Sequence, residues 1–221
     1  MTDSVHDRYE RIQIAKLLEQ HPGLRIVASE DDDLIVSGRL QFTVSGPDGR
    51  EVSDEYDLEL CIHTGFPDAV PSVRETGGRI ADDYHKLTGN RLCLGSPTRI
   101  RIGLACSPTM PAFVDQFVVP YLYGHSRYEQ DGTMPYGELS HGPDGIRDDL
   151  AALFRAPQAA RPEEFLRLAG MIKRLANRQS CPCGSGRRLG RCHNISVNTM
   201  RKLLGRIWFE AEYYRVADLL R

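Results

Sequence analysis

The chain has 221 residues, of which 41% are hydrophobic, 26% charged and 8% aromatic, and this composition excludes collagen-like, low-complexity and disordered proteins. It contains no run of about 18 apolar residues, so the sequence predicts no membrane span. The opening residues, MTDSVHDRYERIQ, lack the apolar core of a signal peptide, and we therefore expect a cytoplasmic protein with reduced thiols.

The net charge of −2 conceals a strong asymmetry along the chain. Residues 1–154 carry 14 Lys and Arg against 25 Asp and Glu, whereas residues 155–221 carry 14 against 5. A Pro- and Ala-rich stretch, 155–162, lies at the change of sign. The sequence therefore predicts two domains, an acidic one at 1–154 and a basic one at 155–221.

The first domain opens with the pattern of an α+β fold. Apolar residues at Ile12, Ala15 and Leu18 predict one helix over 8–20, which His21-Pro-Gly23 ends. Four segments with strand character follow: 24–28, 34–44, 51–63 and, shorter, 72–74. A helix followed by an antiparallel meander is typical of α+β proteins and excludes a Rossmann fold.

The third strand segment predicts one buried and one wetter face of the sheet. Apolar and polar residues alternate along it, with Tyr56, Leu58, Leu60 and Ile62 on one face and Asp57, Glu59, Cys61 and His63 on the other.

The rest of the chain predicts loops and helices. We expect mostly loop over 79–101, and an irregular Gly- and Tyr-rich stretch over 124–145. Helices are predicted at 111–122, 146–154, 163–177 and 198–220. The last helix carries an apolar stripe that can pack on the first domain or on a partner, and core packing is the expectation we favour. Its residues are Leu203, Leu204, Ile207, Trp208 and Tyr214.

A cysteine-rich knuckle lies between the last two helices. Cys181 and Cys183, followed by Cys192 and His193, provide three sulfurs and one imidazole, the donor set of a closed tetrahedral zinc site. Glycines within the segment allow the backbone to turn tightly around an ion. We expect the arginines at 187, 188 and 191 to lower the thiolate pKa values and offset the charge of the sulfurs.

The knuckle resembles the SEC-C motif, which occurs at the C-terminus of the SecA translocase motor and as an accessory module in many bacterial proteins. The resemblance includes every ligand position, with Leu189 where an aromatic residue is usual. It implies structural zinc and a small docking surface for a protein or a nucleic acid. It does not imply catalysis, because four protein ligands leave no position for a substrate.

The remaining cysteines are Cys61, Cys93 and Cys106. Lone cysteines are usually small buried hydrophobic residues, which is our expectation for Cys61 and Cys106. Cys93 lies in a polar loop shortly after His85 and Asn90, a combination that suits covalent nucleophilic chemistry.

The order of motifs around Cys93 resembles that of the ubiquitin-conjugating enzymes. A helix and β-meander lead to Phe66-Pro-Asp-Ala-Val-Pro-Ser-Val73, then Tyr84-His85, then Gly-Asn-Arg-Leu-Cys-Leu94 and a helix. These segments correspond to the family's YP-x-x-x-P-x-V, YHPN and NG-x-I-C-L stretches. The resemblance covers residues 8–125 and implies a UBC-like fold followed by a small helical zinc knuckle.

The resemblance also implies a reaction and its partners. Cys93 would accept the C-terminal glycine of a ubiquitin-like protein as a thioester from an adenylating enzyme, and pass it to an acceptor amine. The Asn that follows His-Pro in the family is replaced by Lys86-Leu87, so Asn90 is the candidate for oxyanion support. His125 and His141 are further candidates for that role or for a general base. These departures are typical of a divergent bacterial branch found in anti-phage and ubiquitin-like operons.

Two non-enzymatic interpretations stay open at this point. The first domain can be a catalytically inactive binding module of the same fold. Alternatively, the basic zinc module can be the main functional part of an adaptor that docks an acidic protein partner or, less favoured, a nucleic acid.

Overall fold

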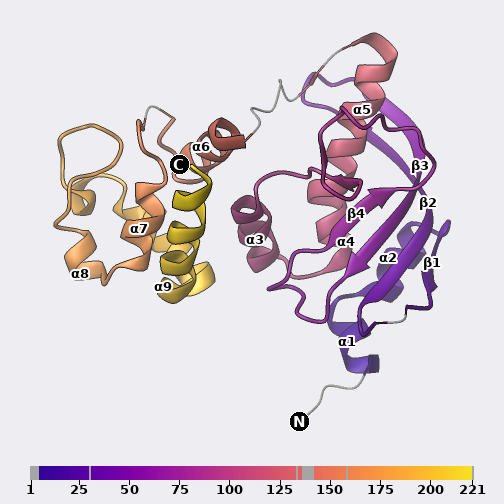
Figure 1. The fold of residues 1–221 in the computed structure, drawn as a ribbon, viewed down its shortest axis with the longest axis horizontal. Helices are drawn as coiled ribbons and strands as arrows, with labels where there is room; N and C mark the ends of the chain where they lie inside the picture. The colour runs from indigo at the N-terminus through magenta and orange to yellow at the C-terminus, as the bar shows by residue number, and fades with distance from the viewer. Residues whose placement is uncertain (1–4, 30, 133, 136–141, 158, 221) are drawn as a thin grey trace. The chain divides into compact units, whose positions relative to one another are not determined.

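The computed structural model describes residues 5–29, 31–132, 134–135, 142–157 and 159–220. The chain forms two compact units (Figure 1). The first comprises Met1–Gly95 and Ser107–Glu138, and the second comprises Ser96–Cys106 and Leu139–Arg221. The expected boundary at 154/155 falls inside the second unit. Among the described residues, no helix has the length and apolar character needed to cross a bilayer.

The first unit contains a six-stranded sheet in the order β1-β2-β3-β4-β6-β5, with antiparallel neighbours throughout. Together with the helices this makes the protein α+β, as the sequence predicts. The strands are β1 (Leu24–Val27), β2 (Leu34–Ser45), β3 (Glu51–Ile62), β4 (Ser72–Glu75), β5 (Lys86–Leu87) and β6 (Arg91–Leu92). The last two were missed in the sequence, where loop was expected.

The long hairpin of β2 and β3 sets the two faces of the sheet. Its register runs from Ser45 opposite Glu51 to Leu34 opposite Ile62. Tyr56, Leu58, Leu60 and Ile62 are buried, as the alternation in the sequence predicts. The opposite face carries polar cross-strand pairs.

The N-terminal helix is broken into α1 (Val5–Arg11) and α2 (Ile14–Gln20), where one continuous helix was expected. Gln13 between them adopts left-handed backbone angles, with φ 58°. Residues two apart lie on opposite sides of a continuous helix, so only such a break allows both Ile12 and Ile14 to be buried. The expected stripe is therefore wrong in part, since Ala15 is exposed.

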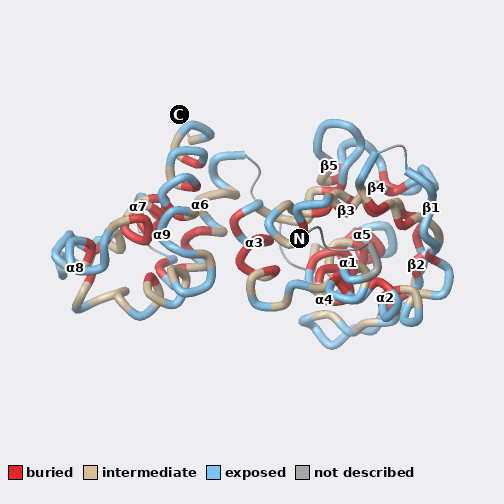
Figure 2. Tube along the Cα trace, turned by 90° about the horizontal axis from the view of Figure 1, so that it is seen from below, coloured by how far each residue is buried: buried red, intermediate tan, exposed pale blue. Residues whose placement is uncertain are grey.

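The helix predicted at 111–122 is longer than expected. It begins with α4 (Met110–Phe113), continues through a π-helical turn, η1 (Val114–Val118), and ends as α5 (Val119–Asp131). Pro120 does not end it, because the π-helical turn just before the proline accommodates the missing N–H donor. Buried residues of these helices and of β2 and β3 form the core of this unit (Figure 2).

The second unit is helical and has its own apolar core. Its core includes Leu150, Phe154, Phe165, Leu168, Val197 and Phe209. Its elements are α3 (Pro97–Cys106), α6 (Gly142–Leu153), α7 (Glu164–Gly170), α8 (Lys173–Ala176), η2 (Leu189–Arg191) and α9 (Asn194–Leu219). Helix α3 packs against α6 and α9, and the Thr98 hydroxyl donates a hydrogen bond to the buried carboxylate of Glu212.

Helices α7 and α9 pack closely at a glycine. A Cβ atom on Gly170 would lie 2.9 Å from backbone atoms of Glu210, so only glycine allows this approach. Arg201, on α9, donates to the carbonyls of Leu168 and Ala169 at 2.8 and 2.9 Å, and Arg206 donates to that of Gly170. Part of the positive charge of this unit therefore caps the C-terminal end of α7.

The apolar stripe expected on the last helix is confirmed only in part. Leu204 and Trp208 pack against the core, but Ile207 and Tyr214 are 76% and 64% exposed. Gly205 has non-helical angles, φ 78° and ψ 162°, which rotate the two halves of α9 relative to each other. Phe209 and Val216 are the buried apolar residues of the second half.

Candidate functional site

Two groups of metal-ligating side chains converge among the described residues, and the larger one is the cysteine-rich knuckle. The Sγ atoms of Cys181 and Cys192 each lie 3.2 Å from Nδ1 of His193. Cys183 Sγ lies 3.5 Å from Cys192 Sγ. Zinc bonds of about 2.0–2.3 Å in a tetrahedron place such donor atoms about 3.5–3.8 Å apart. The donor set and spacing therefore fit a zinc-binding module.

Backbone hydrogen bonds shape the knuckle before any ion is considered. The Cys181 amide donates to the Arg187 carbonyl at 2.9 Å, and the Cys192 amide donates to that of Leu189 at 3.0 Å. Gly184 and Gly186, with φ values of 75° and 71°, make the tight turns between the ligand pairs. Leu189, at the position where related motifs have an aromatic residue, is 1% exposed and belongs to the core.

The surroundings of the ligands determine their protonation. Nε2 of His193 lies 3.2 Å from the Arg155 carbonyl, so it carries the proton and leaves Nδ1 free to bind an ion. Burial raises the pKa of the Cys181 thiol to about 12. Burial also acts on Cys183, but hydrogen bonds from the side chain and backbone of Ser185 lower its pKa to about 6.

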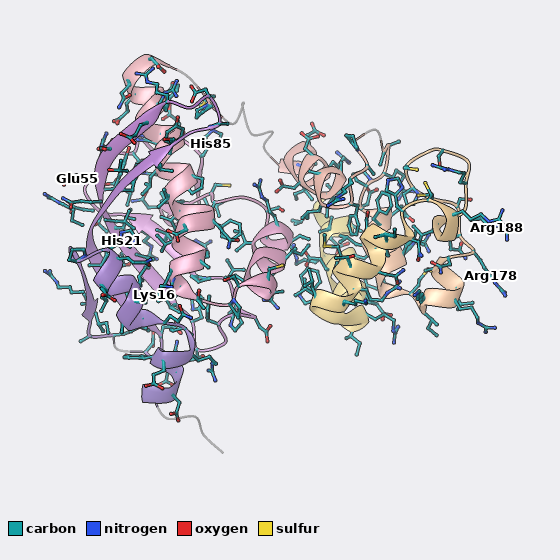
Figure 3. All side chains as sticks on the ribbon, turned by 180° about the vertical axis from the view of Figure 1, so that it is seen from behind. Lys16, His21, Glu55, His85, Arg178 and Arg188 are labelled. Carbon is teal, nitrogen blue, oxygen red and sulfur yellow. The ribbon has the colours of Figure 1, made fainter. Side chains whose placement is uncertain are left out.

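Of the three arginines expected near the sulfurs, Arg187 is in contact. Its guanidinium lies 3.5 Å from Cys192 Sγ. Arg188 extends away from the knuckle into solvent (Figure 3). Charge compensation at the sulfurs therefore comes from Arg187 and from hydrogen bonds.

Residues 178–194 match the family model of the SEC-C motif. The match includes all four converging side chains and covers only this short part of the chain. Searches of curated proteins and of solved structures returned no match for the chain. The SEC-C segment is thus the part of the protein with a family assignment.

Cys93 lies directly after β6, in a short hairpin formed by β5 and β6. Its side chain is partly exposed, and its amide donates to the His85 carbonyl at 2.8 Å. This bond continues the pairing of β5 and β6 by one step. The backbone of Cys93 is therefore fixed by this pairing, and the residue as a whole is partly exposed.

A half-buried tyrosine of α5 supports the same segment. The Tyr121 hydroxyl donates to the carbonyls of Tyr84 and His85 at 3.1 and 3.3 Å. Burial raises the pKa of Tyr121 well above its ordinary value, so the hydroxyl stays protonated and remains a donor. This role of Tyr121 was not predictable from the sequence, because a tertiary hydrogen bond leaves no local pattern.

His85 and Asn90 lie at different places relative to Cys93. The His85 backbone is opposite Cys93, while its ring packs edge-on against Tyr84 at a centroid distance of 4.9 Å. Asn90 is exposed at the tip of the hairpin, with φ 60°. Cys93 lies three positions after Asn90 along an extended chain, which corresponds to a rise of about 10 Å. Asn90 suits a tight turn with left-handed angles, and the hairpin does not bring its amide to the sulfur.

Two arginines lie near Cys93 in the sequence, Arg91 and Arg99, and each has a defined partner. The Arg91 guanidinium donates to the Thr88 carbonyl of the hairpin turn at 3.1 Å. Arg99 belongs to the second unit and pairs with Asp149 at 3.5 Å.

His125 is a buried histidine with a hydrogen-bonded partner. Its Nδ1 lies 2.8 Å from the Tyr56 hydroxyl, which in turn lies 2.9 Å from the Ser126 hydroxyl. Burial lowers the pKa of His125, so its ring is neutral at neutral pH. His141, the other candidate base, lies outside the described residues.

The same buried network continues to a charged group. Asp54 accepts from Ser126 at 2.7 Å and from Arg79 at 2.7 Å, and Arg79 also pairs with Glu129. The Arg79 guanidinium lies over the Tyr56 ring at 4.3 Å. This network links strand β3 to helix α5, and its role is to stabilise the fold.

The expectation for the other two cysteines is wrong. Cys106 is exposed, and Cys61 is only partly buried, because it lies on the polar face of the sheet.

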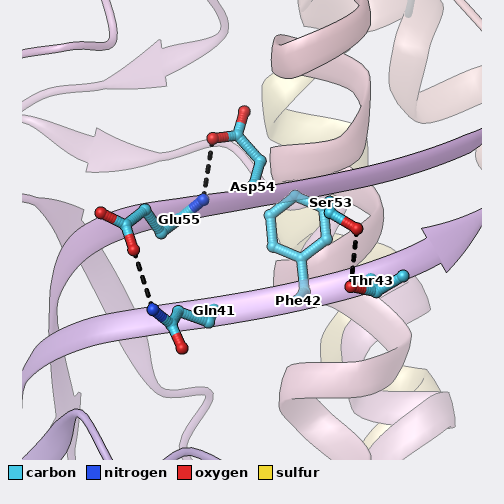
Figure 4. A pocket seen from close by; sticks show the side chains of 6 residues that line it. All are labelled: Gln41, Phe42, Thr43, Ser53, Asp54 and Glu55. Atoms are coloured by element: carbon cyan, nitrogen blue, oxygen red, sulfur yellow. Dashed lines mark hydrogen bonds between the residues drawn. The ribbon is translucent and has the colours of Figure 1, made fainter.

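A shallow pocket on the surface of β2 and β3 is lined by Gln41, Phe42, Thr43, Ser53, Asp54 and Glu55 (Figure 4). Cross-strand hydrogen bonds join Gln41 to Glu55 at 2.9 Å and Thr43 to Ser53 at 2.8 Å. None of the predicted site residues lines this pocket.

Proposed function

We propose that the first unit is an acyltransferase of the ubiquitin-conjugating type, with a UBC-like fold and Cys93 as its nucleophile. The observation that carries the proposal is that Cys93 is a partly exposed residue whose amide is bound by the His85 carbonyl, a carbonyl that Tyr121 also binds. The order of elements supports the proposal of a UBC-like fold: N-terminal helices, an antiparallel meander, the cysteine hairpin and, after α3, a long helix. The motifs around Phe66, Tyr84 and Cys93 support the same assignment.

The reaction has two steps. The Cys93 thiolate attacks the thioester that joins a ubiquitin-like protein to its activating enzyme, a new C–S bond forms, and the enzyme's thiolate leaves. An acceptor amine then attacks the Cys93 thioester, an amide bond forms, the Cys93 thiolate leaves, and the amine proton passes to a base. A positioned donor for the oxyanion of the second step is worth about 10²–10³ in rate.

Mass spectrometry of Cys93 tests the proposal. The full chain is coexpressed with the adenylating enzyme and ubiquitin-like protein encoded beside it, or with a panel of such pairs. We expect an adduct that thiols release, that Cys93→Ala abolishes and that Cys93→Ser converts into a thiol-resistant oxyester. Cys106→Ser is the matched control, because Cys106 is also free and exposed. An adduct that survives in Cys93→Ala contradicts the proposal.

A second function is favoured by one observation, the position of Asn90 at the tip of the hairpin. Without an amide near the sulfur, the first unit can be an inactive binding module of the same fold. In that case Cys93 reacts with iodoacetamide but accepts no acyl group from any activating enzyme. The rate at which a Cys93 thioester is discharged to lysine can be compared in wild type and Asn90→Ala. Equal rates exclude Asn90 from the reaction and leave the transferase proposal intact.

We further propose that the SEC-C group holds structural Zn²⁺ and keeps a basic docking surface in shape. The exposed residues around the knuckle are basic with apolar neighbours: Ile172, Lys173, Arg174, Leu175, Arg178, Arg188 and Arg191. Arg178 and Arg188 both extend outward (Figure 3). Such a surface suits an acidic partner.

Two measurements test the docking module. Cys181→Ser should remove one tightly bound zinc per chain, and zinc-free protein of unchanged stability would contradict the metal assignment. Charge reversal at Arg178 and Arg188 should weaken salt-sensitive binding to polyglutamate, with Lys16→Glu in the first unit as control. Stronger weakening toward a DNA duplex than toward polyglutamate would favour a nucleic-acid partner.

A further inference from the structure

A second group of ligand side chains lies in the first unit, apart from the SEC-C knuckle. Asp33 Oδ2, Cys61 Sγ and His63 Nδ1 all lie within 4.8 Å of one another. The distances are 2.7 Å between Asp33 and His63, 3.6 Å between Cys61 and Asp33, and 4.0 Å between Cys61 and His63. We propose that these three side chains form a second, open site for a divalent transition-metal ion of the zinc class.

The sheet register brings the three residues together. Leu34 pairs with Ile62, so Asp33 and His63 face each other just beyond the ends of β2 and β3. Cys61 is two residues before His63 and therefore points to the same face. This is the polar face of the sheet, since the intervening Ile62 is buried. The cluster is a consequence of a long, regular hairpin and needs no loop to assemble it.

The donor atoms fit a tetrahedral ion. Zinc bonds of about 2.0–2.3 Å hold an oxygen, a nitrogen and a sulfur about 3.3–3.6 Å apart. The sulfur distances are near this range, and the shorter Asp33–His63 distance is that of a hydrogen bond. An ion takes the place of the proton that these two groups share, and the pair then separates by about 0.6 Å to reach the zinc spacing.

The surroundings orient the carboxylate toward the site. The Thr64 amide donates to Oδ1 of Asp33 at 3.2 Å, which leaves Oδ2 for His63 and Cys61. Supporting hydrogen bonds of this kind hold metal ligands in place. One carboxylate and one thiolate also balance the two positive charges of the ion.

The site differs from the SEC-C knuckle in being open. It offers three protein ligands, and the side chains of His63 and Asp33 are 41% and 26% exposed. Three ligands leave a fourth position for water or for a side chain of a bound partner. An ion here joins the start of β2 to the end of β3, and its binding should be weaker than that of the four-ligand knuckle.

Cobalt provides a spectroscopic test on the full chain with zinc kept in the knuckle. After mild chelation, Co²⁺ is titrated into wild type, and we expect one added equivalent with a near-ultraviolet thiolate band. Cys61→Ser should remove the band, and His63→Gln and Asp33→Asn should weaken binding about tenfold or more. His21→Gln, which changes a partly exposed histidine of the same unit, is the control. No thiolate band in wild type, or an unchanged band in Cys61→Ser, overturns the proposal.

Alkylation of the wild-type protein gives an independent readout that needs no variant. Zn²⁺ should slow the reaction of Cys61 with iodoacetamide at least tenfold, and a chelator should restore it. Cys106, exposed and free, is the internal reference and should react at the same rate throughout. Equal rates for Cys61 with and without Zn²⁺ contradict the site.

Discussion

The partly buried ion pair of Asp54 and Arg79 provides a quantitative test of the first unit. Burial of Asp54 acts to raise its pKa, but hydrogen bonds from Arg79 and Ser126 outweigh it and lower the pKa from 3.8 to about 2. Each pKa unit is worth about 1.4 kcal/mol, so the ionised carboxylate stabilises the folded unit by about 2 kcal/mol. The side chains of Asp54 and Arg79 are 16% and 37% exposed, so solvent screening reduces the full value of about 2.5 kcal/mol to about 2 kcal/mol.

Asp54→Asn keeps the shape of the side chain and removes its charge. We expect the free energy of unfolding of the first unit to fall by about 2 kcal/mol at pH 7. The folded-state pKa lies below the unfolded one, so the stabilisation is complete above about pH 4 and is lost as the pH falls toward 2. The difference between wild type and Asp54→Asn should therefore disappear over that interval.

Urea unfolding at several pH values measures this effect. Far-ultraviolet circular dichroism follows both units, and emission from Trp208, the single tryptophan, follows the second unit alone. Asp57→Asn is the matched control on the same strand, because the Asp57 side chain is 43% exposed and its pair with Arg39 is worth at most about 1 kcal/mol. A loss in Asp54→Asn no larger than in Asp57→Asn, or a loss independent of pH, would refute the reasoning.

Three further predictions follow from contacts within each unit. Tyr121→Phe removes the hydroxyl that binds the carbonyls of Tyr84 and His85 and should destabilise this segment by about 1–3 kcal/mol. Hydrogen exchange at the Cys93 amide should become faster, and unchanged exchange would show that Tyr121 does not stabilise the hairpin. Gly170→Ala places a Cβ 2.9 Å from the Glu210 backbone and should destabilise the second unit by about 1–3 kcal/mol, read from Trp208 emission in urea. Strong chelation should remove the metal from the knuckle and lower the urea concentration at which Trp208 emission reports unfolding of the second unit. Cys181→Ser should have the same effect without chelator.

The strands were predictable because each one repeats a local pattern. Alternating burial over 51–62 marks β3 and its inner face, and the turn at 45–51 fixes the pairing with β2. Applied to the ends of the hairpin, the same pairing rule brings Asp33 opposite His63. That cluster was therefore within reach of the sequence, although Cys61 was assigned to the core.

The helix boundaries and the hairpin before Cys93 were not predictable in this way. The break at Gln13 and the rotation at Gly205 arise from which residues the tertiary core buries. Strands β5 and β6 contain two residues each, too few for any periodicity. The SEC-C ligands were identified because metal coordination imposes fixed spacing, whereas the relation of Asn90 to Cys93 depends on the path of a short hairpin.

The chain passes from one unit to the other three times, after residues 95, 106 and 138. A fragment cut at 139 or at 155 would therefore lack α3, and Glu212 would lose the Thr98 hydroxyl that accompanies it in the interior. Helix α3 belongs to the second unit and begins only four residues after Cys93. Unfolding of the second unit would therefore leave the chain that follows Cys93 without a folded segment to hold it. If the knuckle holds zinc as proposed, loss of the metal should therefore also disorder the chain that follows the proposed nucleophile.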